Sequence, residues 1–310
     1  MDILLWVGLF VLSLAILVKG SDWFIEAAED IGLALGIPSF IIGVTIVAMG
    51  TSLPELAASI AGVLSGESEI VIGNAVGSNI ANIALVLGIT ALVGKKMAFK
   101  VDLMVTDIPL LVCSAFLLWF FLLPDADGIA RIDTFEAILL LIGLVIFLAY
   151  SFSSNGDEEK PARTKISART YGLLLIGGIA VFLGATYTVK AIIEISGFFG
   201  ISSGAIALSA VAVGTSLPEI VVSISATRRG KPEIAIGNIL GSNIFNTFAV
   251  VGIPALIGEL KIPAIITDFS LPMMIALTLL FFFIMISKTV SRWEGLMLLL
   301  FYIYFIVRLF

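Results

Sequence analysis

The chain has 310 residues, of which 60% are hydrophobic and 13% are charged, and its mean hydropathy is +1.17. A soluble domain of this length does not carry so large an apolar fraction, so the composition excludes a soluble globular protein. The net charge of −6 points to no particular partner, while the absence of histidine removes the commonest transition-metal ligand and the usual proton relay near neutral pH.

Apolar runs of about 20 residues or more, enough to cross the hydrocarbon core of a bilayer, recur along the whole chain. They predict an all-α, multi-pass membrane protein with ten transmembrane spans. In chain order the predicted spans are 2–32, 38–64, 69–93, 102–123, 133–152, 167–199, 203–227, 233–257, 266–287 and 292–309. The polar segment 153–166 is expected to be a solvated cytoplasmic linker, too short for a domain of its own.

The first span contains the charged residues Lys19, Asp22 and Glu26. Their spacing of three and four residues is typical of ion pairs along one helix face, and long side chains can also reach the membrane surface. We therefore predict local ion pairs or interfacial contacts for these residues.

The second span contains the motif Gly-Thr-Ser-Leu-Pro-Glu at positions 50–55. A carboxylate within hydrocarbon is costly and normally marks the path of an ion or a substrate. Pro54 has no N–H, so the carbonyl of Gly50 loses its helical partner, and Thr51 and Glu55 share one helix face. The carbonyl, the hydroxyls and the carboxylate are oxygen donors, which hard cations such as Ca²⁺ and Na⁺ prefer. The motif therefore predicts half of a cation site in a broken helix.

The third span supplies further oxygen donors. Asn74, Ser78 and Asn82 lie four residues apart and form a polar stripe on one helix face. Gly73 and Gly77 give the same helix a surface of small residues, which lets a neighbouring helix approach closely. We expect this approach to bring the stripe and the motif of the second span into one coordination shell.

The second half of the chain repeats both motifs. A shift of 164 positions aligns 31–94 with 195–258 without a gap, and about half of the aligned residues are identical. The repeated polar residues are Thr215, Ser216, Glu219, Asn238, Ser242 and Asn246. We predict an internal duplication, with a first five-helix repeat at 1–152 (motif region 48–82) and a second at 167–310 (motif region 212–246).

Basic residues indicate the orientation, because loops rich in lysine and arginine stay in the cytoplasm. If the chain begins outside, the cytoplasmic set is Lys95, Lys96, Lys100, Lys160, Arg163, Lys165, Arg169, Arg228, Arg229, Lys231, Lys288 and Arg292, and the outer set is Arg131, Lys261 and Arg308. This asymmetry predicts that both termini lie outside the cell membrane. Each repeat has an odd number of spans, so the second is inverted relative to the first, a pattern of secondary transporters with a site near the midplane.

At these motifs the chain resembles the cation/calcium antiporter superfamily, and within it the prokaryotic sodium/calcium exchangers. Gly-Thr-Ser-Leu-Pro-Glu followed by Gly-Asn-x-x-Gly-Ser-Asn occurs twice, and the likeness extends to the ten-span layout. The resemblance implies that spans two, three, seven and eight form the ion site and that spans one and six slide as a gating bundle. It also implies electrogenic exchange of three Na⁺ for one Ca²⁺.

The resemblance implies a set of ion ligands by motif position. They are Glu55, Glu219, Thr51, Ser52, Ser78, Asn82, Thr215, Ser216, Ser242 and Asn246, together with backbone carbonyls at Ala48 and Ala212. Some members of the superfamily, including potassium-dependent ones, have aspartate where this chain has Asn246. The neutral amide at this position therefore favours potassium-independent exchange.

These observations predict a monomeric antiporter that expels Ca²⁺ by using inward Na⁺ flow, through alternating access, without a cofactor. One alternative is H⁺/Ca²⁺ antiport at the same two glutamates, although the stretch 73–79 lacks the further acidic residue that the proton/calcium branch usually carries. A cation channel is a second alternative. The sequence contains no nucleophile–base pair, zinc motif or nucleic-acid surface, so we expect neither an enzyme nor a nucleic-acid partner.

Overall fold

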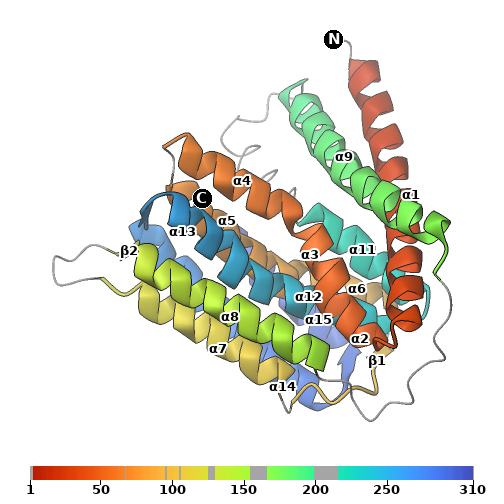
Figure 1. The fold of residues 1–310 in the computed structure, drawn as a ribbon. Coiled ribbons are helices and arrows are strands. Elements are labelled where there is room, and N and C mark those ends of the chain that lie inside the picture. Colours follow the sequence, from red (N-terminus) through yellow and green to blue (C-terminus); the bar gives the residue numbers. More distant parts are fainter. Residues whose placement is uncertain are drawn as a thin grey trace.

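The computed structural model describes residues 3–66, 68–94, 96–104, 106–124, 130–153, 166–198 and 216–309, and Figure 1 shows them as a bundle of helices. Six of the described helices are long and apolar enough to cross a membrane: Ile3–Ala34, Glu69–Gly94, Thr134–Ser153, Ala168–Ala191, Pro232–Ile257 and Ile266–Ile286. The helix pair Ser39–Thr51 and Leu53–Leu64, bent by 40° at its break, is a seventh candidate span. The prediction of an all-α membrane protein is confirmed.

The helices run in the following order along the chain, with η marking π-helical turns. The first half contains α1 (Ile3–Ala34), α2 (Ser39–Ile42), η1 (Gly43–Val47), α3 (Ala48–Thr51), α4 (Leu53–Leu64), α5 (Glu69–Ala81), η2 (Asn82–Val86), α6 (Leu87–Gly94), α7 (Asp107–Phe121) and α8 (Thr134–Ser153). The second half contains α9 (Ala168–Phe198), α11 (Leu217–Arg228), α12 (Pro232–Phe245), η3 (Asn246–Val250), α13 (Val251–Ile257), η4 (Ile266–Ser270), α14 (Leu271–Ile286) and α15 (Arg292–Leu309).

Three of the ten predicted spans do not form long apolar helices within the described residues. α7 has only 15 residues, because the helix begins at Asp107 and not at residue 102. α15 has 18 residues but carries charges near both ends. The seventh predicted span, 203–227, begins outside the described residues, and only its second part is seen as α11. The ten-span layout therefore stays a prediction.

Two short antiparallel ladders, which the sequence analysis did not foresee, join loops that are distant along the chain. β1 (Lys96–Ala98) pairs with β4 (Thr289–Ser291), and β2 (Arg131–Ile132) pairs with β3 (Leu260–Lys261). Strands of two or three residues are too short for a detectable alternation of apolar and polar side chains. Each ladder joins two loops that the distribution of basic residues assigns to the same side of the membrane.

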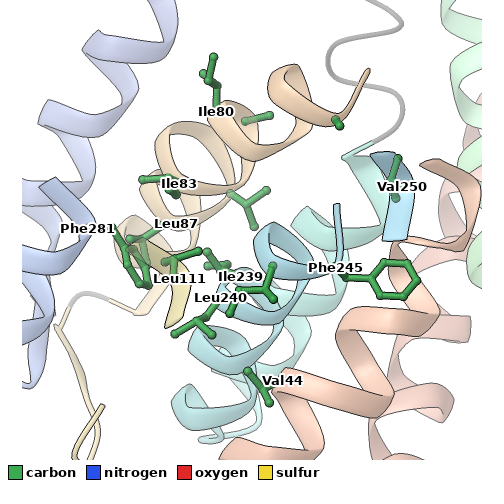
Figure 2. Packing of buried hydrophobic residues seen from close by; sticks show 14 of the residues in the cluster. Val44, Ile80, Ile83, Leu87, Leu111, Ile239, Leu240, Phe245, Val250 and Phe281 are labelled. Atoms are coloured by element: carbon green, nitrogen blue, oxygen red, sulfur yellow. The ribbon is translucent and has the colours of Figure 1, made fainter. Parts of the chain in front are cut away.

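The central helix of the bundle is α12, which continues through η3 into α13. In the 18-residue apolar stretch of Pro232–Ile257, 89% of the residues are buried. In the corresponding stretch of α1, 22% are buried. Figure 2 shows Ile239 and Leu240 of α12 among side chains from other elements, including Val44, Leu87 and Phe281. Because α12 is enclosed by protein, its polar side chains face other helices and not lipid.

Glycines let α12 lie very close to the second predicted span, as the small-residue pattern predicted. A Cβ atom at Gly237 would lie 2.6 Å from the carbonyl oxygen of Phe40, and one at Gly241 would lie 2.2 Å from that of Val44. The equivalent glycines of α5, Gly73 and Gly77, meet no described atom within 4 Å. The positions that the repeat would place against them fall within 199–215, outside the described residues.

Positions 164 apart in the two halves have the same local backbone. Ser52 (φ −91°, ψ 6°) and Ser216 (φ −87°, ψ 5°) each precede a helix that starts with Leu-Pro-Glu. Gly66 (φ 80°) and Gly230 (φ 74°) occupy the turns that follow these helices, in the left-handed region that glycine adopts without strain. The duplicated sequence therefore produces matching breaks and turns.

α1 and α9 lie side by side along one edge of the bundle (Figure 1). A Cβ atom at Gly20 of α1 would lie 2.6 Å from the Cβ of Ala180. At Gly184 of α9, which aligns with Gly20 in the repeat, the nearest atom would be the Cα of Leu17 at 2.8 Å. The two helices are thus packed backbone to backbone through equivalent glycines.

Three of the four acidic residues of α1 pair with the other half of the chain. The Arg229 side chain lies 3.3 Å from Asp22 (Nε to Oδ1) and 3.5 Å from Glu26 (Nη1 to Oε2), and Lys231 pairs with Glu29. The prediction of local pairs was therefore wrong for Asp22 and Glu26. The two carboxylates do lie on one face of α1, but that face contacts the basic turn between α11 and α12. The sequence of α1 alone does not indicate which distant segment packs against it.

Candidate cation-binding site

The starts of α4 and α11 place Glu55 and Glu219 in the interior of the bundle. α3 ends at Thr51, and α4 begins at Leu53 after the single residue Ser52, with a proline in its first turn, so the break falls where the motif predicted it. α11 begins in the same way. Each glutamate therefore lies in the first turn of a helix, where free N–H groups and the positive end of the helix dipole stabilise negative charge.

The two carboxylates are fully buried and only partly hydrogen-bonded. Glu55 and Glu219 are 0% exposed. The Ser52 hydroxyl of one half donates to Glu219 Oε1 of the other half at 3.1 Å, whereas Glu219 Oε2 and both carboxylate oxygens of Glu55 have no hydrogen-bond partner among the described residues. The hydrogen bond from Ser52, which lies three residues before Glu55, brings the two buried carboxylates into the same region of the bundle. Buried negative charges in this arrangement require a positive partner.

Hydroxyl and carbonyl oxygens converge beside the carboxylates. Thr51 Oγ1 lies 3.2 Å from the Ala48 carbonyl oxygen, 3.1 Å from Asn238 Oδ1 and 3.5 Å from Ser242 Oγ. Ser242 Oγ also lies 3.5 Å from the Ala48 carbonyl oxygen. The motif of α3 therefore meets the polar stripe of α12, so one half of the chain contacts the other at the site.

Two amides in the site lie at local distortions of their helices. Asn82 is the first residue of η2 and Asn246 is the first residue of η3. Both side chains are buried, and neither amide has a hydrogen-bond partner among the residues that the structure describes. Buried polar atoms without partners are rare, and π-helical turns are frequent at functional sites. These two amides therefore have oxygens that are free to accept a further contact, as the prediction of ion ligands at Asn82 and Asn246 requires.

The structure describes ten of the twelve residues predicted to bind ions. Nine of them contribute side chains, all buried, and Ala48 contributes its carbonyl oxygen: Glu55, Glu219, Thr51, Ser52, Ser78, Asn82, Ser216, Ser242, Asn246 and Ala48. Thr215 and Ala212 lie outside the described residues. The contacts above bring Ala48, Thr51 and Ser242 together and join Ser52 to Glu219, while the binding role of every residue stays a prediction.

Two serines that the sequence analysis did not assign to the site, Ser59 and Ser223, pair with the asparagines of the polar stripe. Asn74 Nδ2 donates to Ser59 Oγ and Asn238 Nδ2 donates to Ser223 Oγ, both at 3.0 Å. Asn74 Nδ2 also donates to the carbonyl oxygen of Glu55 at 3.0 Å. Ser59 and Ser223 are 164 positions apart, as are the two asparagines, and this shared offset was the signal that could have identified the pairs.

The donor set has the chemistry of a site for hard cations. Within the described part of the chain, no group of three or more His, Cys, Asp or Glu side chains is placed to hold a metal ion. The site instead combines two carboxylates with neutral hydroxyl, amide and carbonyl oxygens. All-oxygen ligands suit Ca²⁺ and Na⁺, and the low count of charged ligands suits an ion that must also be released.

Comparisons with known proteins agree with this chemistry. The family model for sodium/calcium exchanger protein matches residues 5–153 and 169–310. The chain is 36% identical to the sodium/calcium exchanger MaX1 of Methanosarcina acetivorans, over 97% of each chain, and 35% identical to the inner membrane protein YrbG of Escherichia coli, over 88% of this chain and 87% of that one. A solved structure of the sodium-calcium exchanger NCX_Mj superposes with a TM-score of 0.85 at 31% identity, over the whole of both chains.

Proposed function

The chain belongs to the sodium/calcium exchanger protein family, and on this premise we propose that it exchanges Na⁺ for Ca²⁺ across the cell membrane by alternating access. The observation that carries the proposal is the pair of fully buried glutamates in the first turns of α4 and α11, together with buried polar atoms of Asn82, Ser216 and Asn246 that lack partners among the described residues. One Ca²⁺ neutralises both carboxylates, and several Na⁺ ions can take the same oxygens. Because the two ions use one set of ligands, they compete, and competition is what antiport requires.

Transport in proteoliposomes tests this function. Vesicles loaded with Na⁺ and diluted into Na⁺-free buffer are expected to take up ⁴⁵Ca²⁺, and uptake should stop when the Na⁺ gradient is collapsed. Exchange of three Na⁺ for one Ca²⁺ moves one net positive charge outward in this assay, so an inside-positive potential should accelerate uptake. Since Asn246 is neutral, adding K⁺ in the absence of a potential should change nothing.

Two further measurements separate the alternative functions. A pH gradient that drives Ca²⁺ uptake without Na⁺ would establish H⁺/Ca²⁺ antiport at the two glutamates. Discrete conductance steps in a planar bilayer would establish a channel. In either case the proposal of Na⁺/Ca²⁺ exchange fails.

We further propose that ten spans form two inverted five-helix repeats, 1–152 and 167–310, joined by the linker 153–166, with both termini outside. The shared backbone breaks at Ser52 and Ser216 support the duplication. The two strand ladders support the assignment of loops to sides, as does the ion pair of 3.0 Å between Lys288 Nζ and Asp102 Oδ2, because each contact joins loops predicted on one side.

Alternating access requires one part of the protein to move against another, and we propose that α1 and α9 move together against the helices that hold the glutamates. Their close packing through Gly20 and Gly184 supports movement as one body. The ion pairs from Asp22 and Glu26 to Arg229 then hold α1 to α11 in the state seen here, at the end of α11 away from Glu219.

Replacing Arg229 with glutamine is expected to change the exchange rate about two- to fivefold. The ion pairs are partly exposed and worth about 0.5–1 kcal/mol, which shifts the balance between two conformations by that factor. The matched control is Arg228→Gln, because the neighbouring Arg228 has no ion pair among the described residues. Equal rates for both variants and the wild type, measured as initial ⁴⁵Ca²⁺ uptake, would contradict a role for the Arg229 ion pairs.

A further inference from the structure

The Thr51 hydroxyl has one proton and two neighbouring atoms that can only accept it. These are the Ala48 carbonyl oxygen at 3.2 Å and Asn238 Oδ1 at 3.1 Å. If the proton points to Ala48, that carbonyl oxygen is occupied by a hydrogen bond. If the proton points to Asn238, the Ala48 carbonyl oxygen keeps only its 3.5 Å contact with the Ser242 hydroxyl, so its second lone pair and the lone pairs of Thr51 Oγ1 can face a cation. The choice between the two acceptors therefore decides how many oxygen ligands the site offers.

The orientation of the Asn238 amide can be read from its counterpart in the other half. Both neighbours of Asn238 are hydroxyls, Thr51 and Ser223, so its own contacts do not distinguish the oxygen from the nitrogen. Asn74, 164 positions earlier, contacts Ser59 and the carbonyl oxygen of Glu55 through one end of its amide. A carbonyl oxygen only accepts hydrogen bonds, so that end is Nδ2. The repeat therefore places Nδ2 of Asn238 on Ser223 and Oδ1 toward Thr51.

We propose that Asn238 is a positioning residue for ion binding, which acts by accepting the Thr51 proton. Its amide oxygen turns the proton away from the site, so that Thr51 Oγ1 and the Ala48 carbonyl oxygen present their lone pairs to the transported cation. Ser223 holds the amide in this orientation by accepting from Nδ2. The three side chains are fully or almost fully buried, so water does not compete for these hydrogen bonds. This inference rests on the proposed Na⁺/Ca²⁺ exchange.

The arrangement also makes ion binding depend on both halves of the chain. Thr51 ends α3 in the first half, and Asn238 lies on α12 in the second. The glycines at 237 and 241, on either side of Asn238, allow the backbones to approach closely enough for the hydrogen bond to form. A separation of α12 from α3 would release the Thr51 proton back to the Ala48 carbonyl oxygen and weaken the site.

Replacement of Asn238 by leucine tests the proposal, because leucine has the same number and branching of side-chain heavy atoms but no hydrogen-bond acceptor. In Na⁺-driven ⁴⁵Ca²⁺ uptake we expect the KM for Ca²⁺ to rise about tenfold, while the maximal rate stays within about twofold of the wild type. In a protein that already carries Thr51→Val, adding Asn238→Leu should not raise the KM for Ca²⁺ further, because Asn238 acts through the Thr51 hydroxyl. Independent, additive effects of the two substitutions would overturn the proposal, as would an unchanged KM in Asn238→Leu.

The matched control is Asn243→Leu, on the same helix. Asn243 is also buried, but its Nδ2 donates to the Ile239 carbonyl oxygen of its own helix at 2.6 Å, so its replacement should leave the KM unchanged. If Asn238→Leu does not fold, Ser223→Ala takes its place, because it releases the amide and is expected to raise the KM about threefold. An unchanged KM in Ser223→Ala would then overturn the proposal. If the wild-type protein shows no Na⁺-dependent ⁴⁵Ca²⁺ uptake, it is the proposed Na⁺/Ca²⁺ exchange that fails, and not the role of Asn238.

Discussion

Replacing either Glu55 or Glu219 with glutamine is expected to reduce Na⁺-driven ⁴⁵Ca²⁺ uptake at least a hundredfold. Glutamine has the shape of glutamate but no charge, so a Ca²⁺ ion in the site loses half of the negative charge that neutralises it. A unit charge about 4 Å away contributes about 4 kcal/mol at the effective dielectric constant of a protein, which corresponds to more than a hundredfold in affinity. Ion binding measured by calorimetry should weaken in parallel with uptake.

The fold should survive these substitutions. Burial of a charged carboxylate costs free energy, so removal of one charge is expected to leave the melting temperature in detergent unchanged or raised. Glu219→Gln should gain less stability than Glu55→Gln, because Glu219 accepts a hydrogen bond from Ser52 and Glu55 accepts none from the described residues. Glu69→Gln, at the exposed start of α5, is the control with a normal transport rate. Full transport in both buried variants would show that the glutamates do not bind the ion.

The position of the site could be predicted from sequence because its signals are local. A proline breaks a helix wherever the chain goes, and a buried carboxylate needs a partner in any fold. Glu55 and Glu219 can therefore be identified as candidate site residues without knowledge of the tertiary structure. The offset of 164 positions indicates that the two motifs are copies of one repeat. α4 and α11 both begin with Leu-Pro-Glu, as the preference of proline for the first turn of a helix predicts.

What sequence could not supply is the set of contacts between elements that are distant along the chain. The hydrogen bond from Thr51 to Asn238 joins residues 187 positions apart, and the one from Ser225 to Asp22 joins residues 203 apart. Such pairings depend on which helices become neighbours. Helical periodicity predicts which face of a helix is buried, but it does not indicate which helix packs against that face. The π-helical turns at Asn82 and Asn246 were also missed, because an inserted residue leaves no reliable mark in the pattern of apolar residues.

Replacing Gly241 with alanine is expected to destabilise the protein by about 3 kcal/mol or more and to abolish transport. The new Cβ atom would lie 2.2 Å from the Val44 carbonyl oxygen and 2.7 Å from the Ala48 Cβ, and a backbone oxygen cannot move aside as a flexible side chain can. α12 must therefore separate from η1 and α3, which also pulls Asn238 and Ser242 away from Thr51. The measurements are thermal unfolding in detergent and ⁴⁵Ca²⁺ uptake.

The control for this substitution is Gly172→Ala in α9, where a Cβ atom meets no described atom within 4 Å. Alanine favours helix over glycine by about 1 kcal/mol, so this variant should be as stable as the wild type or more stable. A Gly241→Ala variant that is as stable as the Gly172→Ala variant and also transports normally would contradict the close approach of α12 to η1. A stable Gly241→Ala variant that has lost transport would show that the clash distorts the ion site without unfolding the protein. The backbone that Gly241 contacts also carries the Ala48 carbonyl and Thr51.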